Sequence, residues 1–269
     1  MNKQTLAKST IVLSSILLLS LTHSLFFLSS VQAQNTKSRP NLSERVKRFF
    51  FGTRPGGVAK GRKRGGAVRG PCRQLSQQII ALVPSTDNGV PFIEQTISQR
   101  PTFWFYIPRL PIEQVKAEFL LLNEQGKEIG SEIFPLRSQP GIIRLQMPSK
   151  ILPLEPNKTY RWAFSAICNP EDRSADVTVN GWLKHTAADS NLNQRLKSTS
   201  GREQVFVYTD SQLWYETLTK LAELRQQNPQ DVTIQTDWAN VLRLMGLPED
   251  APKTWTTYPL PSNADTTSR

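Results

Sequence analysis

The stretch from Arg100 to Pro108, which reads Arg-Pro-Thr-Phe-Trp-Phe-Tyr-Ile-Pro, constrains the fold more than any other part of the chain after its N-terminal leader. Consecutive aromatic residues between two prolines favour a short strand that is covered on both faces. Side chains alternate between the two faces of a strand. We therefore expect Phe103 and Phe105 to face a partner sheet. Trp104 and Tyr106 should lie on the opposite face, beneath helices from the C-terminal part of the chain.

Residues 72–186 are predicted to form one β domain, because short apolar runs of period two alternate with clusters of Pro, Gly, Asn and Asp. The turns at 124–127 and 169–174 should each join two strands into a hairpin. Strands at this spacing are typical of an antiparallel β-sandwich of the immunoglobulin or fibronectin type. The expected strands are Gln78–Val83, Thr102–Ile107, Val115–Asn123, Glu128–Phe134, Gly141–Met147, Thr159–Cys168 and Asp176–Lys184.

A tyrosine corner is predicted where the sixth of these strands begins. Residues 152–160 place two prolines and an asparagine before Tyr160, as in corners where a tyrosine hydroxyl bonds back to the upstream backbone. Trp162 and Phe164 follow with period two and share the face of Tyr160. These three residues are predicted to join the aromatic residues 103–106 in the core.

Cys72 and Cys168 are the two cysteines of the chain. In an exported protein, two cysteines predict a disulfide bond, and two free thiols are the alternative. Because Cys168 ends its expected strand and Cys72 precedes the first, the bond should tie the start of the domain to a rim of the sandwich. It should not cross the core as the disulfide of antibody domains does.

Beyond residue 186 the apolar period changes from that of strands to that of helices. Residues 191–198 suggest a short helix, and residues 203–208 are ambiguous between helix and strand. Two longer helices are predicted, one at 211–227 capped by Asp210 and one that opens at Pro229 and stops at Gly246. Neither can bury its apolar stripe alone, so residues 187–247 should form a helical hairpin docked on the sandwich. Residues 248–269 read as a polar tail.

Together these features resemble a known family. The cysteine motif at Cys72, the aromatic strand 101–108, the strand 154–168 and the helices of 213–246 are similar to the domain of unknown function 928 family. The resemblance covers roughly residues 72–247. It implies an exported protein with this architecture, since the family is known mainly as secreted cyanobacterial proteins without an established activity. It supplies no catalytic residues.

Residues 1–33 have the layout of a secretory signal peptide. Lys3 and Lys8 form a basic start, an apolar body runs from 11 to 28, and Val31-Gln32-Ala33 is a small-residue cleavage site. A retained membrane anchor is the alternative, because the apolar body is near the minimum length that spans a bilayer. The expected location is secreted or periplasmic.

The formal net charge of +11 is concentrated in residues 34–71, which carry eleven Lys and Arg against Glu44 alone. Residues 72–269 are nearly neutral, with 20 basic and 21 acidic residues. The composition of 34–71, rich in glycine and poor in apolar residues, predicts a disordered basic arm. A short helix with Leu42, Val46, Phe49 and Phe50 on one face could lie on an anionic lipid surface; a solvated linker is the alternative. The residues proposed to bind anionic surfaces are Arg45, Lys47, Arg48, Lys60, Arg62, Lys63 and Arg64.

The residues available for chemistry are few. His185 is the one histidine after the leader, so neither a His/Cys zinc site nor a Ser-His-Asp triad is expected, and no cofactor or metal is predicted. Glu118, Glu128 and Glu132 could meet across the hairpin 115–134 and resemble the carboxylate pair of a glycosidase, although outward solvated positions explain them as well.

We expect a non-catalytic envelope protein that acts as a binding or interaction module. Its partner would be an unidentified envelope protein or polysaccharide, with the basic arm attaching to anionic surfaces. The alternative is a glycan-acting hydrolase that uses the paired glutamates. Nucleic acid is disfavoured by export, and aromatic residues left exposed would instead suggest a ligand-stacking platform.

Overall fold

A computed structural model describes residues 41–51, 61–66, 72–75, 78–111 and 115–258. The predicted signal peptide and its alternative, a membrane anchor, lie outside these residues. None of the helices in the described ranges is long and apolar enough to cross a membrane.

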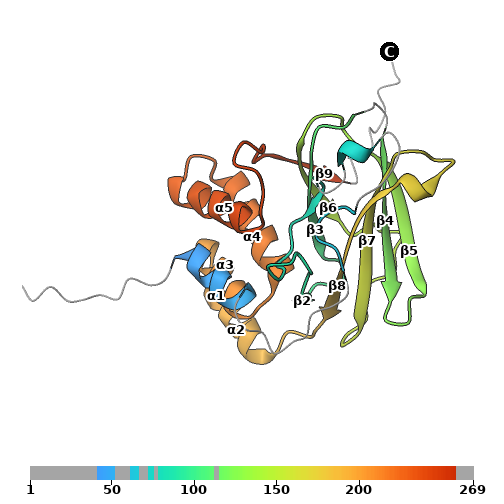
Figure 1. Cartoon of the computed structure of the whole chain (residues 1–269). Helices are drawn as coiled ribbons and strands as arrows, with labels where there is room; N and C mark the ends of the chain where they lie inside the picture. Colours follow the sequence, from blue (N-terminus) through green and yellow to red (C-terminus); the bar gives the residue numbers. More distant parts are fainter. Residues whose placement is uncertain (1–40, 52–60, 67–71, 76–77, 112–114, 259–269) are drawn as a thin grey trace, which may run out of the picture. The chain divides into compact units, whose positions relative to one another are not determined.

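The described strands form two sheets that pack face to face (Figure 1). The first sheet has the order β1-β3-β6-β9, and the second has the order β2-β8-β7-β4-β5. The strands of the first sheet are β1 (Ile80–Ala81), β3 (Thr102–Ile107), β6 (Gly141–Gln146) and β9 (Trp255–Tyr258). Those of the second are β2 (Ile93–Thr96), β4 (Lys116–Asn123), β5 (Glu128–Pro135), β7 (Thr159–Ile167) and β8 (Val177–His185).

The prediction of a β-rich domain with helices is confirmed, but the prediction of purely antiparallel sheets is wrong. The β4–β5 and β7–β8 hairpins are present as expected. In contrast, β2 pairs parallel with β8, and β9 pairs parallel with β6. Both parallel strands are four-residue edge strands that join partners distant in sequence, so local periodicity did not reveal them. An immunoglobulin-like topology is not confirmed, and the segment 255–258 of the expected polar tail is a strand.

The core between the sheets includes the aromatic residues that the sequence predicted to be buried. Phe103 lies 4.6 Å from Phe119, and Phe105 stacks 4.2 Å from Phe164, measured between ring centroids. Trp162 contacts both Phe103 and Phe105. Every residue of β3 is buried, because the strand is covered by the second sheet on one face and by other elements on the other.

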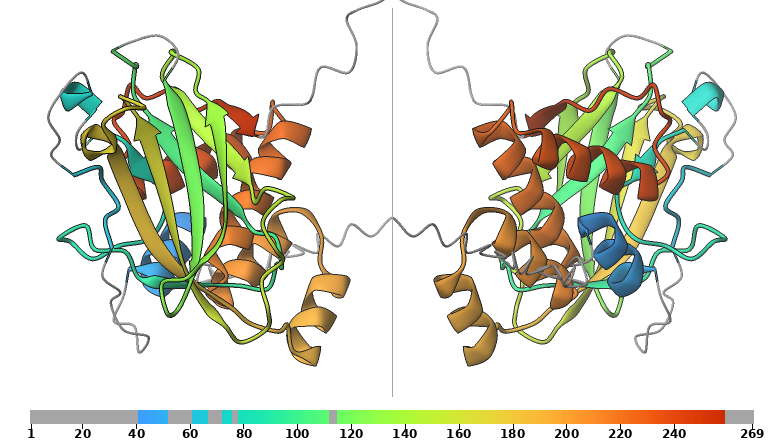
Figure 2. Two further views of the ribbon diagram at one scale, coloured as in Figure 1. Left: turned by 90° about the vertical axis from the view of Figure 1, so that its right-hand side faces the viewer. Right: turned by 90° about the vertical axis from the view of Figure 1, so that its left-hand side faces the viewer.

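The helices cover the outer face of the first sheet and leave the outer face of the second uncovered (Figures 1 and 2). Trp104 donates a hydrogen bond from Nε1 to Thr219 Oγ1 at 3.1 Å and packs edge-on against Trp238 at 5.8 Å. Trp104 therefore lies beneath helices as predicted, and Tyr106 is buried as well. The helices are α1 (Leu42–Phe50), α2 (Ser190–Ser198), α3 (Gly201–Asp210), α4 (Trp214–Gln227) and α5 (Val232–Leu244).

The helical layer is larger than the predicted hairpin. The ambiguous segment 203–208 is helical, as part of α3. Asp210 ends α3 and does not cap the next helix, because residues 211–213 form a turn in which Gln212 has a positive φ of 58°. Helix α5 is capped by Asp231, whose side chain accepts hydrogen bonds from Thr233 N and Ile234 N.

The disulfide bond and the tyrosine corner are present. Cys72 and Cys168 are bonded, and their Cα atoms are 5.7 Å apart. The bond joins the turn before β1 to the end of β7, at a rim of the sandwich. Tyr160 Oη accepts a hydrogen bond from Glu155 N at 2.9 Å, which closes the corner five residues upstream.

The part of the basic arm that the structure describes is folded, so the prediction of disorder is wrong there. Helix α1 packs on α3 and α5, and its residues Leu42, Val46 and Phe50 are completely buried. The apolar face that could have contacted lipid is thus used in the core. Residues 61–66 pair with both sheets, through Arg62 with Asn180 and through Arg64 with Ile80.

Candidate functional site

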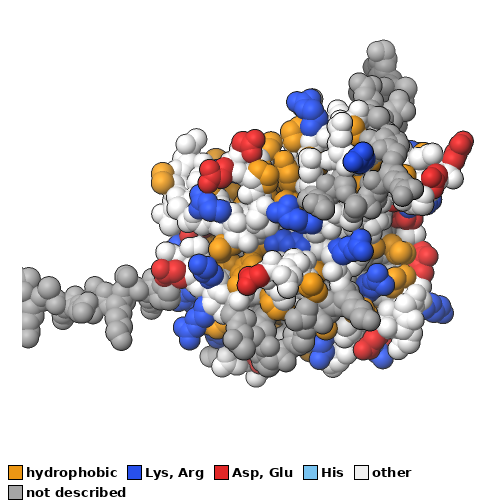
Figure 3. All heavy atoms as spheres, in the orientation of Figure 1, with side chains coloured by type: hydrophobic (Ala, Val, Ile, Leu, Met, Phe, Trp, Pro, Cys, Tyr) orange, Lys and Arg blue, Asp and Glu red, His pale blue; other side chains and the backbone are white. Residues whose placement is uncertain are grey.

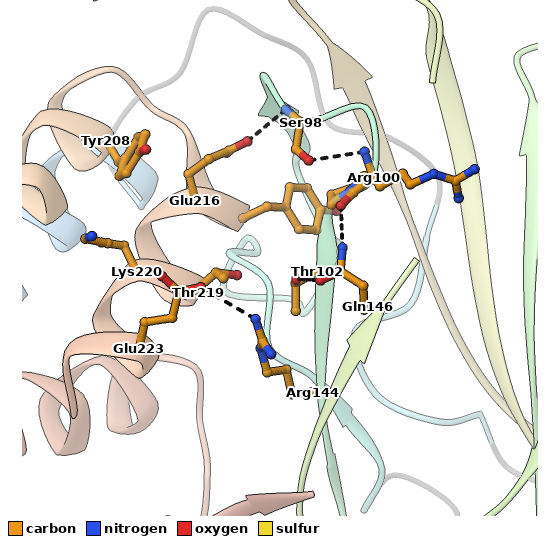
Figure 4. A pocket seen from close by; sticks show the side chains of 12 residues that line it. Ser98, Arg100, Thr102, Arg144, Gln146, Tyr208, Glu216, Thr219, Lys220 and Glu223 are labelled. Atoms are coloured by element: carbon orange, nitrogen blue, oxygen red, sulfur yellow. Dashed lines mark hydrogen bonds and ion pairs between the residues drawn. The ribbon is translucent and has the colours of Figure 1, made fainter. Parts of the chain in front are cut away.

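A polar cleft of about 310 Å³ lies between α4 and the helix-facing side of the first sheet (Figure 4). Thr102 pairs with Gln146, and Trp104 pairs with Arg144, in the antiparallel register of β3 and β6. The register brings all four side chains to one face, where α4 packs above them. The cleft is lined by Ser98, Arg100, Pro101, Thr102, Arg144, Gln146, Tyr208, Tyr215, Glu216, Thr219, Lys220 and Glu223.

Glu216 fixes the loop that forms one wall of the cleft. Its Oε1 atom accepts hydrogen bonds from Thr96 Oγ1 at 2.6 Å, Ile97 N at 2.9 Å and Ser98 N at 3.2 Å. Its Oε2 atom is buried and has no hydrogen-bond partner among the described residues. Burial raises the pKa of Glu216, opposed by these hydrogen bonds. Because Oε2 is withdrawn from solvent, we assign Glu216 a positioning role rather than ligand contact.

The opposite wall is fixed by a chain of hydrogen bonds. Thr102 Oγ1 donates to Gln146 Oε1 at 3.0 Å, and Gln146 Nε2 donates to Arg100 O at 2.7 Å. The Arg100 guanidinium points away from the cleft, toward Pro148 O and Ser149 O (Figure 4). Arg100 therefore stabilises the wall and leaves its charge outside.

Arg144 reaches across the cleft from β6 toward α4 (Figure 4). Its guanidinium lies 6.0 Å from the ring centroid of Trp104 and 3.5 Å, through Nη2, from Glu223 Oε1. The side chain of Arg144 is 24 % exposed and that of Glu223 is 42 % exposed. Both groups can therefore contact a ligand in the cleft.

Lys220 and Tyr208 supply further hydrogen-bond donors. None of the described residues accepts a hydrogen bond from the Lys220 ammonium or the Tyr208 hydroxyl. Burial, with smaller effects of the Glu216 and Glu223 charges, raises the pKa of Tyr208, so its hydroxyl stays protonated at neutral pH. With Arg144, the open groups of this cleft are mostly donors.

The face of the molecule shown in Figure 3 is mixed in charge. Lys and Arg side chains are dispersed among Asp, Glu and apolar side chains on the face shown in Figure 3, and no single basic patch dominates it. This agrees with the nearly neutral sequence of residues 72–269.

The proposed surface-binding cations are not equivalent in the structure. Arg45 Nη1 pairs with Asp210 Oδ2 at 2.7 Å, Lys63 is buried, and Arg64 Nη2 donates to Gly246 O. Arg45 and Lys63 are therefore structural, which corrects the prediction for these two. The exposed cations are Lys47, Arg48, Arg62 and Arg64, and Lys60 lies outside the described residues.

The structure does not bring the glutamates of the β4–β5 hairpin into a pair. Glu118 lies opposite the exposed Ile133, whereas Glu132 lies opposite the buried Phe119, so the two carboxylates belong to opposite faces of the sheet. Glu118 instead pairs with Arg173 at 2.6 Å. Glu132 pairs with Lys150 at 3.0 Å, and Glu128 accepts a hydrogen bond from Ser131.

His185 is buried at the end of β8, and its Nε2 lies 3.3 Å from Ile97 O. It therefore braces the same loop that Glu216 holds. Among the described residues, no group of three His, Cys, Asp or Glu side chains could hold a metal ion.

The cleft was not predicted from the sequence, although one feature of the sequence points to it. In Gly-Ile-Ile-Arg-Leu-Gln of β6, Arg144 and Gln146 interrupt one face of a strand whose other face is apolar. A strand beneath helices should not carry such residues on its covered face unless they are used there. What the sequence could not show is that α3 places Tyr208 beside the same cleft, and that α4 places Lys220 and Glu223 there.

The described residues form two packed sheets with a helical layer, and a polar cleft lies beneath that layer. Residues 64–255, more than two thirds of the chain, match the profile of the family described as Domain of Unknown Function (DUF928). The protein belongs to this family. No curated protein and no solved structure matches the chain. Residues 1–63, which include helix α1, lie outside the matched residues.

Proposed function

We propose that this protein is a non-catalytic binding module of the cell envelope and that its ligand is a hydroxyl-rich small molecule, most simply a unit of an envelope polysaccharide. The observation that carries the proposal is the cleft, which is lined by hydrogen-bond donors from α3, α4 and β6. A disulfide bond supports an oxidising compartment such as the periplasm or the exterior.

The size and the chemistry of the cleft suit a saccharide. Its volume of about 310 Å³ lies at the lower end of small-molecule sites, enough for roughly one or two sugar rings. Tyr208 offers both an aromatic face and a hydroxyl, and Lys220, Thr219 and Arg144 offer donors to ring hydroxyls. The walls are held by internal hydrogen bonds, so little ordering is needed when a ligand binds.

The proposal is tested by titrating the mature chain with mono- and oligosaccharides in a calorimeter. We expect saturable binding that Tyr208→Ala weakens by about tenfold, since the substitution removes both stacking and a hydrogen bond. Lys220→Met should also weaken binding. Lys127→Met, on the exposed β4–β5 turn, is the matched control and should bind normally. Binding that persists unchanged in both cleft variants would exclude this site.

We also propose that the exposed cations Lys47, Arg48 and Arg62 attach the protein to anionic surfaces. This retains the attachment expected for the basic arm but limits it to side chains that the fold does not use.

A further inference from the structure

The ion pair between Arg144 and Glu223 is longer than the close ion pairs among the described residues. Its N–O distance is 3.5 Å, whereas Arg173–Glu118 and Arg202–Asp237 are both 2.6 Å. Charge-assisted hydrogen bonds between guanidinium and carboxylate groups are typically about 2.7–2.9 Å. Arg144 therefore holds its carboxylate loosely, through one long contact.

The two members of this pair are held with different rigidity. Arg144 is anchored on the central strand β6, and its guanidinium lies near the ring of Trp104, which is 3 % exposed. Glu223 projects from the surface of α4 and is 42 % exposed. The cation is thus preorganised, while the carboxylate can rotate into solvent at small cost.

The rest of the cleft lacks another carboxylate that could accept hydrogen bonds from Arg144, Lys220 or Tyr208. Glu216 directs its carboxylate into the 96–98 loop, where Oε1 is used three times and Oε2 is buried. Lys220 and Tyr208 are open donors. When Glu223 turns away, the cleft presents two cations and hydroxyl groups without a competing anion.

We propose that the cleft selects saccharides that carry a carboxylate, of the uronic-acid type, and that Glu223 occupies the place of this carboxylate on Arg144 in the free protein. The proposal rests on the proposed function and names its ligand class. The planar guanidinium can donate two parallel hydrogen bonds to a ligand carboxylate, whereas Glu223 at its present distance does not accept such a pair. Lys220 adds a second positive charge.

The test compares glucuronate, its methyl ester and glucose as ligands of the mature chain by calorimetry. The wild-type protein should bind glucuronate with at least about tenfold higher affinity than the ester, because only the acid forms charge-assisted hydrogen bonds. Arg144→Gln should remove this difference, because it should weaken binding of glucuronate far more than binding of the ester or of glucose. Arg144→Lys keeps the charge but not the paired hydrogen bonds, so it should retain part of the preference for glucuronate. A general folding defect caused by substitution at this position would not leave such a preference.

Glu223→Gln gives the sharper readout, because the predicted effect is a gain. Removing the internal competitor should tighten glucuronate binding, relative to glucose binding, by about two- to fivefold. Glu249→Gln makes the same change of charge at an exposed residue that does not line the cleft, and it should have no effect.

Distinct results overturn the two proposals. If Glu223→Gln weakens glucuronate binding, or if Arg144→Gln weakens glucose and glucuronate equally, the selection is wrong while saccharide binding stands. The same holds if glucose 6-phosphate binds more tightly than glucuronate, since the site would then be one for phosphate. If none of the sugars binds, both the proposed function and the selection fail.

Discussion

Lys63 is buried in the fold, although the sequence predicted that it binds anionic surfaces. Its side chain is 6 % exposed, between the pairings of Arg62 with β8 and of Arg64 with β1. Burial, with a smaller effect of the neighbouring Arg64 charge, lowers the pKa of Lys63 to about 7. The amine is therefore partly neutral at physiological pH.

This burial makes stability depend on pH in a defined direction. Between the folded pKa of about 7 and the unfolded value of 10.5, the unfolded chain binds more protons at Lys63 than the folded chain does. The stabilisation from the neutral amine is complete above the unfolded pKa and is lost as pH falls to the folded pKa. The free energy of unfolding should therefore rise between these values.

We predict that Lys63→Met abolishes this rise and makes the protein more stable at pH 7, by an amount on the order of a few kcal/mol. Methionine keeps the apolar stem without a charge to desolvate. Urea denaturation at a series of pH values measures the effect, with Lys127→Met as the exposed control. An unchanged slope in Lys63→Met would show that the amine is not buried.

Helix α1 is encoded by its local sequence, but its stability depends on packing against the rest of the protein. Asn41 caps it with a complete capping box through Glu44, so the helix is locally encoded. Two turns are too short to be stable alone, and α1 depends on its docking. Phe50 packs edge-on against Trp214 at 5.0 Å, while Arg45 lies 4.6 Å above the ring of Phe206.

The docking of α1 should depend on the pair of Arg45 with Asp210, which Arg45 Nη1 contacts at 2.8 and 2.7 Å. We predict that Arg45→Glu destabilises the protein by about 1 to 3 kcal/mol, because a partly buried ion pair becomes a repulsion. Adding Asp210→Arg should restore part of the loss. The restoration should be incomplete, since Arg195 lies 3.9 Å from Asp210 and would repel the new arginine.

A double-mutant cycle from chemical denaturation measures this coupling. Additive effects of the two reversals would mean that the pair contributes nothing. A single reversal without effect would mean that α1 does not dock in solution as it does in the structure.

At the scale of the whole molecule, the positive charge divides into a structural part and a free part. Arg45 and Lys63 are used by the fold, whereas Lys47, Arg48 and Arg62 are exposed. The attraction to an anionic surface increases with the number of exposed cations, and salt screens it.

We predict that replacing Lys47, Arg48 and Arg62 with glutamine weakens binding to phosphatidylglycerol vesicles at low salt, by about fivefold for each cation removed, without lowering the melting temperature. Co-sedimentation at increasing salt measures it. The matched control removes three exposed cations from the open face of the second sheet, at Lys116, Arg161 and Lys184. Equal losses in both variants would indicate an effect of net charge alone.

Features that depend on interactions within short segments of the chain could be predicted from the sequence. The hairpins β4–β5 and β7–β8, the tyrosine corner and the stop of the last helix at Gly246 are encoded by turns and periodicity within short segments. They were predicted for that reason. The alternation of Phe103 and Trp104 between two faces followed from strand geometry in the same way.

The candidate site could not be predicted, because it exists only where distant segments meet. Glu216 on α4 acts through hydrogen bonds to a loop more than a hundred residues earlier. Arg144 and Glu223 come from a strand and a helix that no local pattern relates.

The β-rich class, the disulfide partners, the covered aromatic strand and the division of charge between residues 34–71 and the rest could all be predicted from the sequence. These depend on composition and on alternation along short stretches of chain. Only the tertiary structure decided that β2 and β9 pair in parallel, that α1 and Lys63 are buried, and that the cleft lies beneath α4. The physical reason is that edge pairing, desolvation and the facing of side chains are properties of contacts between segments far apart in the chain.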